Sequence, residues 1–164
     1  MNQNKESSGL TCPLTGCPIW KVLLATVVTF AVTFGFDWLF HGNYMKADYE
    51  ATASLWRPEA EMQQLLQWCL VYHGVLAFSV AALYCWISRI SSCNGTCQKT
   101  GLKFGLLVGL IIGITHFGGY LWMPIPMEMA LKWLSGTILW GLLVGLALSL
   151  TCRACKSSCS KDAK

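Results

Sequence analysis

Four apolar runs, each long enough to cross a lipid bilayer, constrain the fold of this 164-residue chain more than any other feature. Residues 62–88, 104–127 and 133–152 contain no Asp, Glu, Lys or Arg, and residues 22–40 contain only Asp37. Crossing the hydrocarbon core takes about 20 helical residues, and a helix satisfies its own backbone hydrogen bonds there. The runs therefore predict an all-α fold, a bundle of four transmembrane helices. The expected helices cover residues 19–41, 65–89, 102–124 and 127–151.

The composition excludes several other classes of protein. Hydrophobic residues make up 54% of the chain and charged residues only 12%, against about 25% charged in a soluble domain. A chain of this length cannot hide so much apolar surface from water. The expected partner is therefore the lipid bilayer and not a nucleic acid. The sequence contains no nucleotide-binding loop, HExxH motif or Ser-His-Asp set, so we do not expect an enzyme.

The polar ends predict the domain organisation and the orientation. A cysteine-containing tail (1–18) precedes the four-helix membrane domain (19–151), and a Cys- and Lys-rich tail (152–164) follows it. Nine of the twelve basic residues lie in the tails, at the inner helix ends or in the loop at 90–101. The positive-inside rule then places both termini in the cytoplasm. Tryptophans near the ends of the runs are typical of the aromatic belts of membrane proteins.

A short amphipathic segment, residues 42–64, is expected on the outer side between the first two helices. We expect a short helix over 48–56 and a helix start at Pro58, where acidic residues favour the helix dipole. The alternative is a cap over the intramembrane histidines, with Glu59 or Glu61 as further ligands.

Glycines recur every four residues in the third and fourth apolar runs. They are Gly101, Gly105, Gly109, Gly113, Gly141 and Gly145. Small residues at this spacing let two membrane helices approach closely. We expect the third helix to pack on the fourth here. The alternative is a face for a homo-oligomer or a larger membrane complex.

Seven of the nine cysteines lie on the side predicted to be cytoplasmic. They are Cys12, Cys17, Cys93, Cys97, Cys152, Cys155 and Cys159. A four-helix bundle brings the three groups to one membrane face, where thiolates could hold zinc or another soft metal such as copper(I) or cluster iron. The alternatives are reduced unpaired thiols, a few disulfides, or lipidation near the membrane.

Four ionisable side chains fall at membrane depth, where such residues are costly and by default mark function. Asp37 and His41 continue a stripe of threonines at positions 26, 29 and 33 of the first helix. His73 and His116 each lie eight residues from the outer end of their helices, about 12 Å deep.

These side chains could perform one of three chemical functions, or they could have a structural role only. Asp37, His73 and His116 could bind a divalent cation, or they could relay protons. His73 and His116 could instead be the axial ligands of a b-type haem. In the structural alternative they are hydrogen-bond partners between helices.

Three stretches resemble those of small four-helix integral membrane proteins of bacteria whose activity is not established. These stretches are residues 36–42 (FDWLFHG) and 55–62 (LWRPEAEM), together with the MPIP turn at 123–126. The resemblance implies a bacterial inner membrane. The sequence as a whole predicts a non-enzymatic binding or accessory subunit that holds a soft metal through its cysteines. The alternatives are a small ion, proton or metal transporter and a haem-containing redox carrier.

Overall fold

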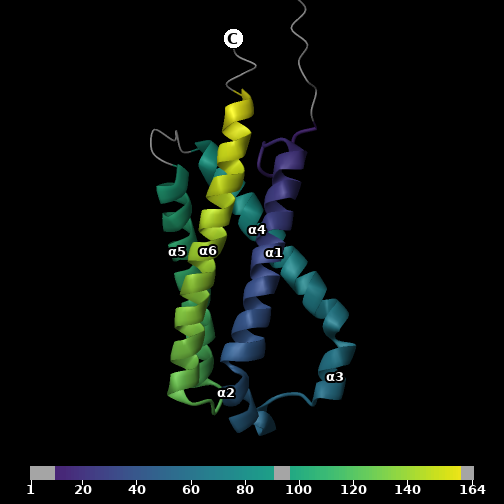
Figure 1. The fold of residues 1–164 in the computed structure, drawn as a ribbon, viewed down its shortest axis with the longest axis vertical. Coiled ribbons are helices and arrows are strands. Elements are labelled where there is room, and N and C mark those ends of the chain that lie inside the picture. Colours follow the sequence, from purple (N-terminus) through teal and green to yellow (C-terminus); the bar gives the residue numbers. More distant parts are fainter. Residues whose placement is uncertain (1–9, 91–96, 160–164) are drawn as a thin grey trace, which may run out of the picture.

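The computed structural model describes residues 10–90 and 97–159, except for the side chains of residues 89, 90, 97 and 152–159. Four long helices run alternately up and down: α1 (Ile19–Leu39), α4 (Leu66–Ile90), α5 (Cys97–Gly118) and α6 (Met127–Cys159) (Figure 1). In the described ranges, extended pairing is limited to one isolated bridge between Thr11 and Pro18. The prediction of an all-α four-helix bundle is confirmed.

Short elements join α1 to α4 and α5 to α6. After α1 come a π-helical turn (Phe40–Tyr44), α2 (Lys46–Ala51), a 3-10 turn (Ala53–Leu55) and α3 (Glu59–Gln64). A 3-10 turn (Gly119–Leu121) follows α5, and the prolines at 124 and 126 separate it from α6 because they cannot continue the helical hydrogen bonds. We call the end of the bundle that carries these connections the α2 end, and the opposite end the terminal end (Figure 1).

Helices α5 and α6 pack with their backbones in close approach. A Cβ atom on Gly105 would overlap the carbonyl oxygen of Gly141, and one on Gly141 would lie 2.7 Å from the Cα of Gly109. Gly101 and Gly145 oppose each other in the same way towards the terminal end. These glycines therefore serve packing within one chain, as their four-residue spacing predicts.

Two apolar clusters fill the bundle at different depths. The larger one occupies the half of the bundle nearer the terminal end, where Val22, Tyr84, Phe104, Trp140 and Leu148 are buried together. The smaller one lies at the α2 end and is built on buried Met45, Ile125, Met129 and Ala130. Helix α4 packs mainly on α1, while α5 packs on α6 and α1 also contacts α6. The larger cluster therefore fills the interior of the bundle in the half nearer the terminal end.

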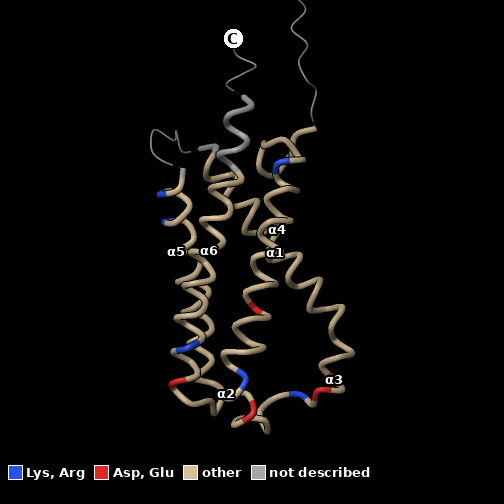
Figure 2. Tube along the Cα trace, in the orientation of Figure 1, with Lys and Arg blue, Asp and Glu red and all other residues tan. Residues whose placement is uncertain are grey.

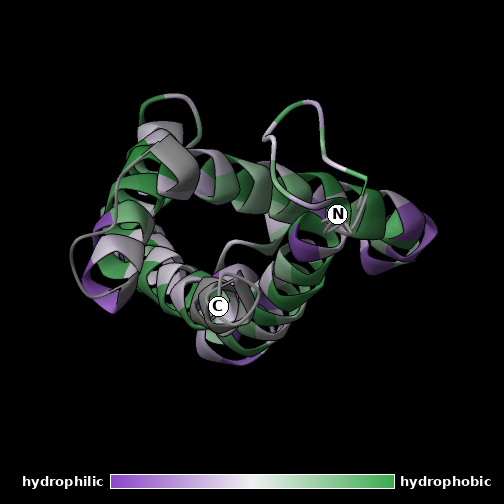
Figure 3. Cartoon of the chain, turned by 90° about the horizontal axis from the view of Figure 1, so that it is seen from above, coloured by the Kyte–Doolittle hydropathy of each residue, from purple (hydrophilic) through white to green (hydrophobic). Residues whose placement is uncertain are grey.

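The outside of the bundle is as apolar as its inside. Large hydrophobic side chains such as Leu23, Val27, Val75 and Ile111 are exposed along the helices, and Figure 3 shows hydrophobic residues on their outward faces. Figure 2 shows most charged residues near the two ends and one acidic residue partway along α1. In the described part of the chain, four helices are long and apolar enough to cross a membrane, as predicted.

Candidate functional site

A carboxylate and an imidazole meet between α1 and α4. The Nε2 atom of His73 lies 2.7 Å from Oδ2 of Asp37. The side chain of His73 is 7% exposed, and that of Asp37 is 34% exposed. Asp37 precedes the end of its candidate span, at Tyr44, by seven residues, and His73 is the seventh residue after the start of α4, Leu66. Two helices that run in opposite directions therefore place the two groups at a similar depth.

The second nitrogen of His73 determines how many protons the pair holds. Its Nδ1 atom lies 2.7 Å from the carbonyl oxygen of Cys69, one turn earlier in α4, and 3.4 Å from Sγ of the same residue, so the carbonyl is the nearer partner. A carbonyl only accepts hydrogen bonds, so Nδ1 carries a proton. A further proton must then lie between Nε2 and Oδ2, either on the imidazole or on the carboxyl, because two bare acceptors would repel each other. Asp37 and His73 together thus hold two protons and have no net charge.

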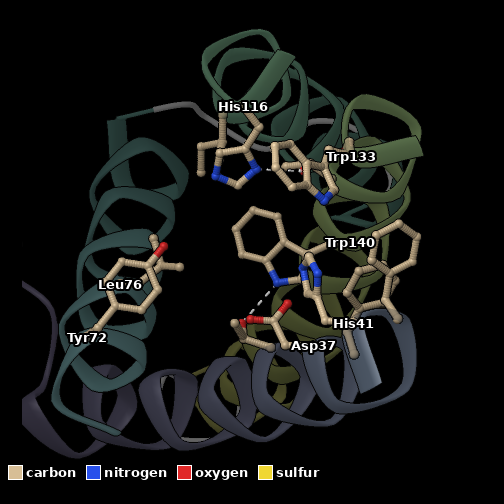
Figure 4. A pocket seen from close by; sticks show the side chains of 12 residues that line it. Asp37, His41, Tyr72, Leu76, His116, Trp133 and Trp140 are labelled. Carbon is tan, nitrogen blue, oxygen red and sulfur yellow. Dashed lines mark hydrogen bonds between the residues drawn. The ribbon is translucent and has the colours of Figure 1, made fainter. Parts of the chain in front are cut away.

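A cavity of about 220 Å³ lies beside this pair, in the half of the bundle nearer the α2 end. All four long helices line it, and Asp37 faces it from α1. Figure 4 shows Asp37 and His41 below, His116 above, and Tyr72 with Leu76 on the wall formed by α4. The cavity wall is aromatic on most sides, with Phe36, Phe40, Tyr72, Trp133 and Trp140. An ionisable pair and an aromatic cavity thus share one wall.

His41 is held at the cavity by an aromatic network from the α2 end. Its Nδ1 atom lies 2.6 Å from the hydroxyl oxygen of Tyr49, which also accepts a hydrogen bond from Nε1 of Trp133 at 3.1 Å. Burial raises the pKa of Tyr49, so its hydroxyl keeps its proton at neutral pH. Tyr49 can therefore donate to Nδ1 of His41, which leaves the Nε2–H of a neutral His41 as a donor.

His116 lies on the other side of the cavity and turns towards α6. Its Nδ1 atom is 3.3 Å from Oγ1 of Thr137, which donates to the carbonyl of Trp133 at 2.7 Å. Because the single hydroxyl proton of Thr137 is used, His116 donates from Nδ1 and keeps a lone pair on Nε2. His116 therefore offers an acceptor to the cavity and makes no contact with the Asp37–His73 pair.

The threonine stripe of α1 continues from the cavity into the bundle. Oγ1 of Thr33 accepts a hydrogen bond from Nε1 of Trp140 at 3.1 Å. One turn deeper, Thr29 is fully buried, and its hydroxyl has no hydrogen-bond partner among the described residues. Thr26 donates to the carbonyl of Val22. The stripe thus leads from the cavity into the larger apolar cluster.

Residues 45–56, here called the cap, pack at the α2 end beside Phe40 and Trp133, two residues that line the cavity. Met45, Tyr49 and Trp56 pack into the smaller apolar cluster. Both carboxylate oxygens of Asp48 lie 2.8 Å from Nζ of Lys132, which ties the cap to α6. The predicted alternative of a cap over the histidines therefore describes this segment in part. Its further ligands do not match, because Glu59 and Glu61 are exposed on α3, outside the cavity lining.

The groups predicted as one metal site do not converge. Asp37 and His73 meet, but His116 bonds to α6, and no three His, Cys, Asp or Glu side chains form a metal-ligand group in the described residues. The haem prediction also fails on geometry. Both ring nitrogens of His73 are engaged, and a cavity of about 220 Å³ is below even the roughly 300–1,000 Å³ of drug-sized sites.

The cysteine cluster is tested only at Cys12 and Cys17. The backbone N–H of Cys12 donates to the carbonyl of Cys17 at 2.8 Å, and Sγ of Cys17 lies 3.7 Å from the carbonyl oxygen of Cys85. Cys93 and the side chains of Cys97, Cys152, Cys155 and Cys159 lie outside the described part of the structure. Convergence of these thiols on a soft metal therefore stays a prediction.

Sequence reasoning missed the aromatic and hydroxyl residues that complete the site. Trp133 and Trp140 bond to Tyr49 and Thr33, whereas tryptophans near span ends are typical of membrane proteins in general. Tyr49 lies in the connection between α1 and α4, where no periodicity singles it out. Of these residues, only Thr33 could be linked to the site from the sequence, because it lies one helical turn before Asp37.

The fold and the site define a four-helix protein with membrane-length helices, in which a buried imidazole and a carboxylate share a proton beside a small aromatic cavity. The chain matches no family model, no curated protein and no solved structure.

Proposed function

We propose that this chain is a small multi-pass membrane transporter that binds and releases a proton at the Asp37–His73 pair. The contact that carries the proposal is the 2.7 Å approach of Nε2 of His73 to Oδ2 of Asp37, with Nδ1 of His73 bonded to a backbone carbonyl. This arrangement binds one proton more than a neutral imidazole and an ionised carboxylate would. Loss of that proton changes the charge of the pair from zero to −1.

The position of the pair supports exchange of that proton with the cavity. A charge at membrane depth is costly, so the energy of the charged state depends on what occupies the adjoining cavity. Asp37 faces the cavity and is one-third exposed, while His73 lies behind it. Occupancy of the cavity and protonation of the pair are therefore thermodynamically linked.

The closure of the bundle supports a transporter rather than an open pore. The larger apolar cluster fills the half of the bundle beyond the cavity, from Val22 and Phe104 to Leu148. A proton that leaves the pair in this state returns to the cavity and not to the opposite side. Transport then requires a second state in which this cluster opens.

We further propose that both termini are cytoplasmic, that the cap is on the outer face and that the protein resides in a bacterial inner membrane. The excess of Lys and Arg in the tails and in the loop at 90–101 supports this orientation. Each of residues 59–72, in α3 and the first part of α4, has an exposed side chain. Association into a homo-oligomer or a larger membrane complex would cover them.

Proton flux into liposomes tests the proposal. The purified protein is reconstituted into vesicles that contain a pH-sensitive dye, and a potassium diffusion potential, negative inside, is imposed with valinomycin. We expect acidification of the lumen faster than in protein-free vesicles. Asp37→Asn should reduce the rate to that of the protein-free vesicles, because the carboxylate that shares the transported proton with His73 is then absent.

Glu59→Gln provides the matched control, since it makes the same chemical change on exposed α3. This variant should keep the wild-type rate. A wild-type rate equal to that of protein-free vesicles, or an Asp37→Asn rate equal to wild type, would contradict the proposed function.

A further inference from the structure

We propose that the cavity binds a small organic ammonium ion and that its binding displaces the proton shared by Asp37 and His73 into the solvent. The inference rests on the proposed function and names the substrate class of the same site. Its basis is a carboxylate that is 34% exposed in the wall of an aromatic cavity of about 220 Å³.

The carboxylate of Asp37 has a face available for a ligand. Oδ2 points to His73, and no hydrogen bond to Oδ1 is found among the described residues. The ionisable groups around Asp37 and its partner are His41 in the π-helical turn, Cys69, Tyr72 and His73 on α4, His116 on α5 and Tyr49 in the cap. Apart from the proton shared with His73, none of them need be charged at neutral pH, so Asp37 is the sole source of negative charge in this wall.

The other walls are suited to a cation that carries alkyl groups. The faces of aromatic rings attract cations within about 6 Å of the ring centre, and cages of such rings bind quaternary ammonium groups. Phe36 and Phe40 stack 5.3 Å apart and line the cavity with Asp37. Figure 4 shows the indole of Trp140 close to Asp37 and that of Trp133 farther away, towards His116. An inorganic cation would lose more hydration than these rings replace, whereas an alkylammonium ion also buries apolar surface.

The size of the cavity limits the ligand to a few heavy atoms. A volume of about 220 Å³ lies below the roughly 300–1,000 Å³ of sites for drug-sized molecules. Tetramethylammonium is therefore the appropriate probe. Its charge is permanent, so any proton that appears on binding comes from the protein.

The exchange conserves charge in the cavity. Before binding, the pair holds two protons and has no net charge. When the cation enters, the proton between Nε2 and Oδ2 passes to a water molecule and leaves with the solvent. His73 keeps the proton on Nδ1, Asp37 is ionised, and the pair at −1 is balanced by the cation at +1.

Calorimetric titration of the purified protein with tetramethylammonium tests the inference. Titrations in two buffers of different ionisation enthalpy give the number of protons released. We expect about one proton per cation bound, and an affinity that falls about tenfold for each unit of decreasing pH while the pair is protonated. Asp37→Asn should abolish binding, and Glu59→Gln should bind as wild type.

Two comparisons distinguish the contribution of the ligand's charge to binding from that of the aromatic rings of the cavity. Neopentyl alcohol is close in size to tetramethylammonium but uncharged, and it should not bind. Phe36→Leu keeps the charge and removes one ring of the cavity, so it should weaken binding roughly 3- to 30-fold. Phe78→Leu, an exposed position on α4 outside the cavity, should leave the affinity unchanged.

The outcomes distinguish this inference from the proposed function. No binding of tetramethylammonium by a protein whose Asp37-dependent proton flux is intact would overturn the inference alone. Binding without proton release, or equal binding of neopentyl alcohol, would also overturn it. Absence of the proton flux itself would instead contradict the proposed function.

Discussion

The imidazole of His73 donates from Nδ1 to the carbonyl of Cys69 and meets Oδ2 of Asp37 through Nε2, each at 2.7 Å. The two contacts fix the ring in one orientation and bridge α4 to α1. Among the described residues, His73 is the one hydrogen-bond partner of the Asp37 carboxylate. The contact therefore serves both the packing of the bundle and its chemistry.

Removal of the imidazole should destabilise the protein. In His73→Ala the carboxylate of Asp37 loses its hydrogen-bond partner between α1 and α4, and we expect a loss of about 1–3 kcal/mol in the free energy of unfolding. Denaturant unfolding in mild detergent, followed by tryptophan fluorescence, measures it. The double variant Asp37→Leu/His73→Leu should recover part of this loss, because no unpaired charge remains. Equal stability of His73→Ala and wild type would contradict the account of the pair.

The close approach of α5 and α6 should not tolerate even a methyl group. In Gly105→Ala the new Cβ would overlap the backbone of Gly141, so the helices must separate. We expect a loss of at least about 1 kcal/mol, measured as a lower midpoint of thermal unfolding. Gly35→Ala is the matched control, since a Cβ at Gly35 would meet no atom within 4 Å. That variant should be neutral or more stable by up to about 1 kcal/mol.

The cap should loosen when its ion pair to α6 is removed. Lys132→Met leaves Asp48 without its two hydrogen bonds to α6, and we expect only a small loss of stability because both side chains are partly exposed. Amide hydrogen exchange at residues 45–56 should become faster than in wild type. Lys46→Met breaks an exposed pair at 3.9 Å to Glu50 and should leave exchange in the cap unchanged. Equal exchange in all three proteins would refute the role of Lys132.

Stability at alkaline pH should report on Tyr49. Burial raises the pKa of this phenol above its ordinary value near 10, so the folded state holds the proton more tightly than the unfolded chain. The contribution of Tyr49 to stability is therefore complete below about pH 10 and is lost as the pH rises through the folded-state pKa. Unfolding measured between pH 9 and 11 should show this decline in wild type and a smaller one in Tyr49→Phe. The opposite sign would mean that Tyr49 is ionised in the folded protein.

The architecture was predictable because hydrophobic length is a property of each segment by itself. The four runs and the glycine spacing required no knowledge of how the helices are rotated. The site did depend on that rotation. The sequence predicts His73 and His116 at the same depth in the membrane, and this is the basis for grouping them. In the structure α4 packs on α1 and α5 packs on α6. His73 therefore contacts Asp37 on α1, and His116 contacts Thr137 on α6. Asp37 was assigned to the same half of the bundle, and its direct contact with His73 follows from the α1–α4 packing.

The aromatic residues of the site could not be predicted from the sequence, for a different reason. Trp133 and Trp140 resemble the tryptophans that occur near membrane boundaries in many proteins, and only their contacts with Tyr49 and Thr33 distinguish them. Tyr49 itself reaches His41 through the fold of the cap. Such contacts arise from the packing of segments distant in the sequence and leave no local pattern.

The central claim is that Asp37 and His73 together hold two protons. Nuclear magnetic resonance of protein in lipid nanodiscs, with ¹⁵N in the histidine rings and ¹³C in the aspartate carboxyls, counts them directly. At neutral pH we predict either an imidazolium with an ionised carboxylate or an Nδ1–H imidazole with a protonated carboxyl, and one bound proton fewer in Asp37→Asn. A neutral ring with a bare Nε2 beside an ionised Asp37 in the wild-type protein would contradict the account.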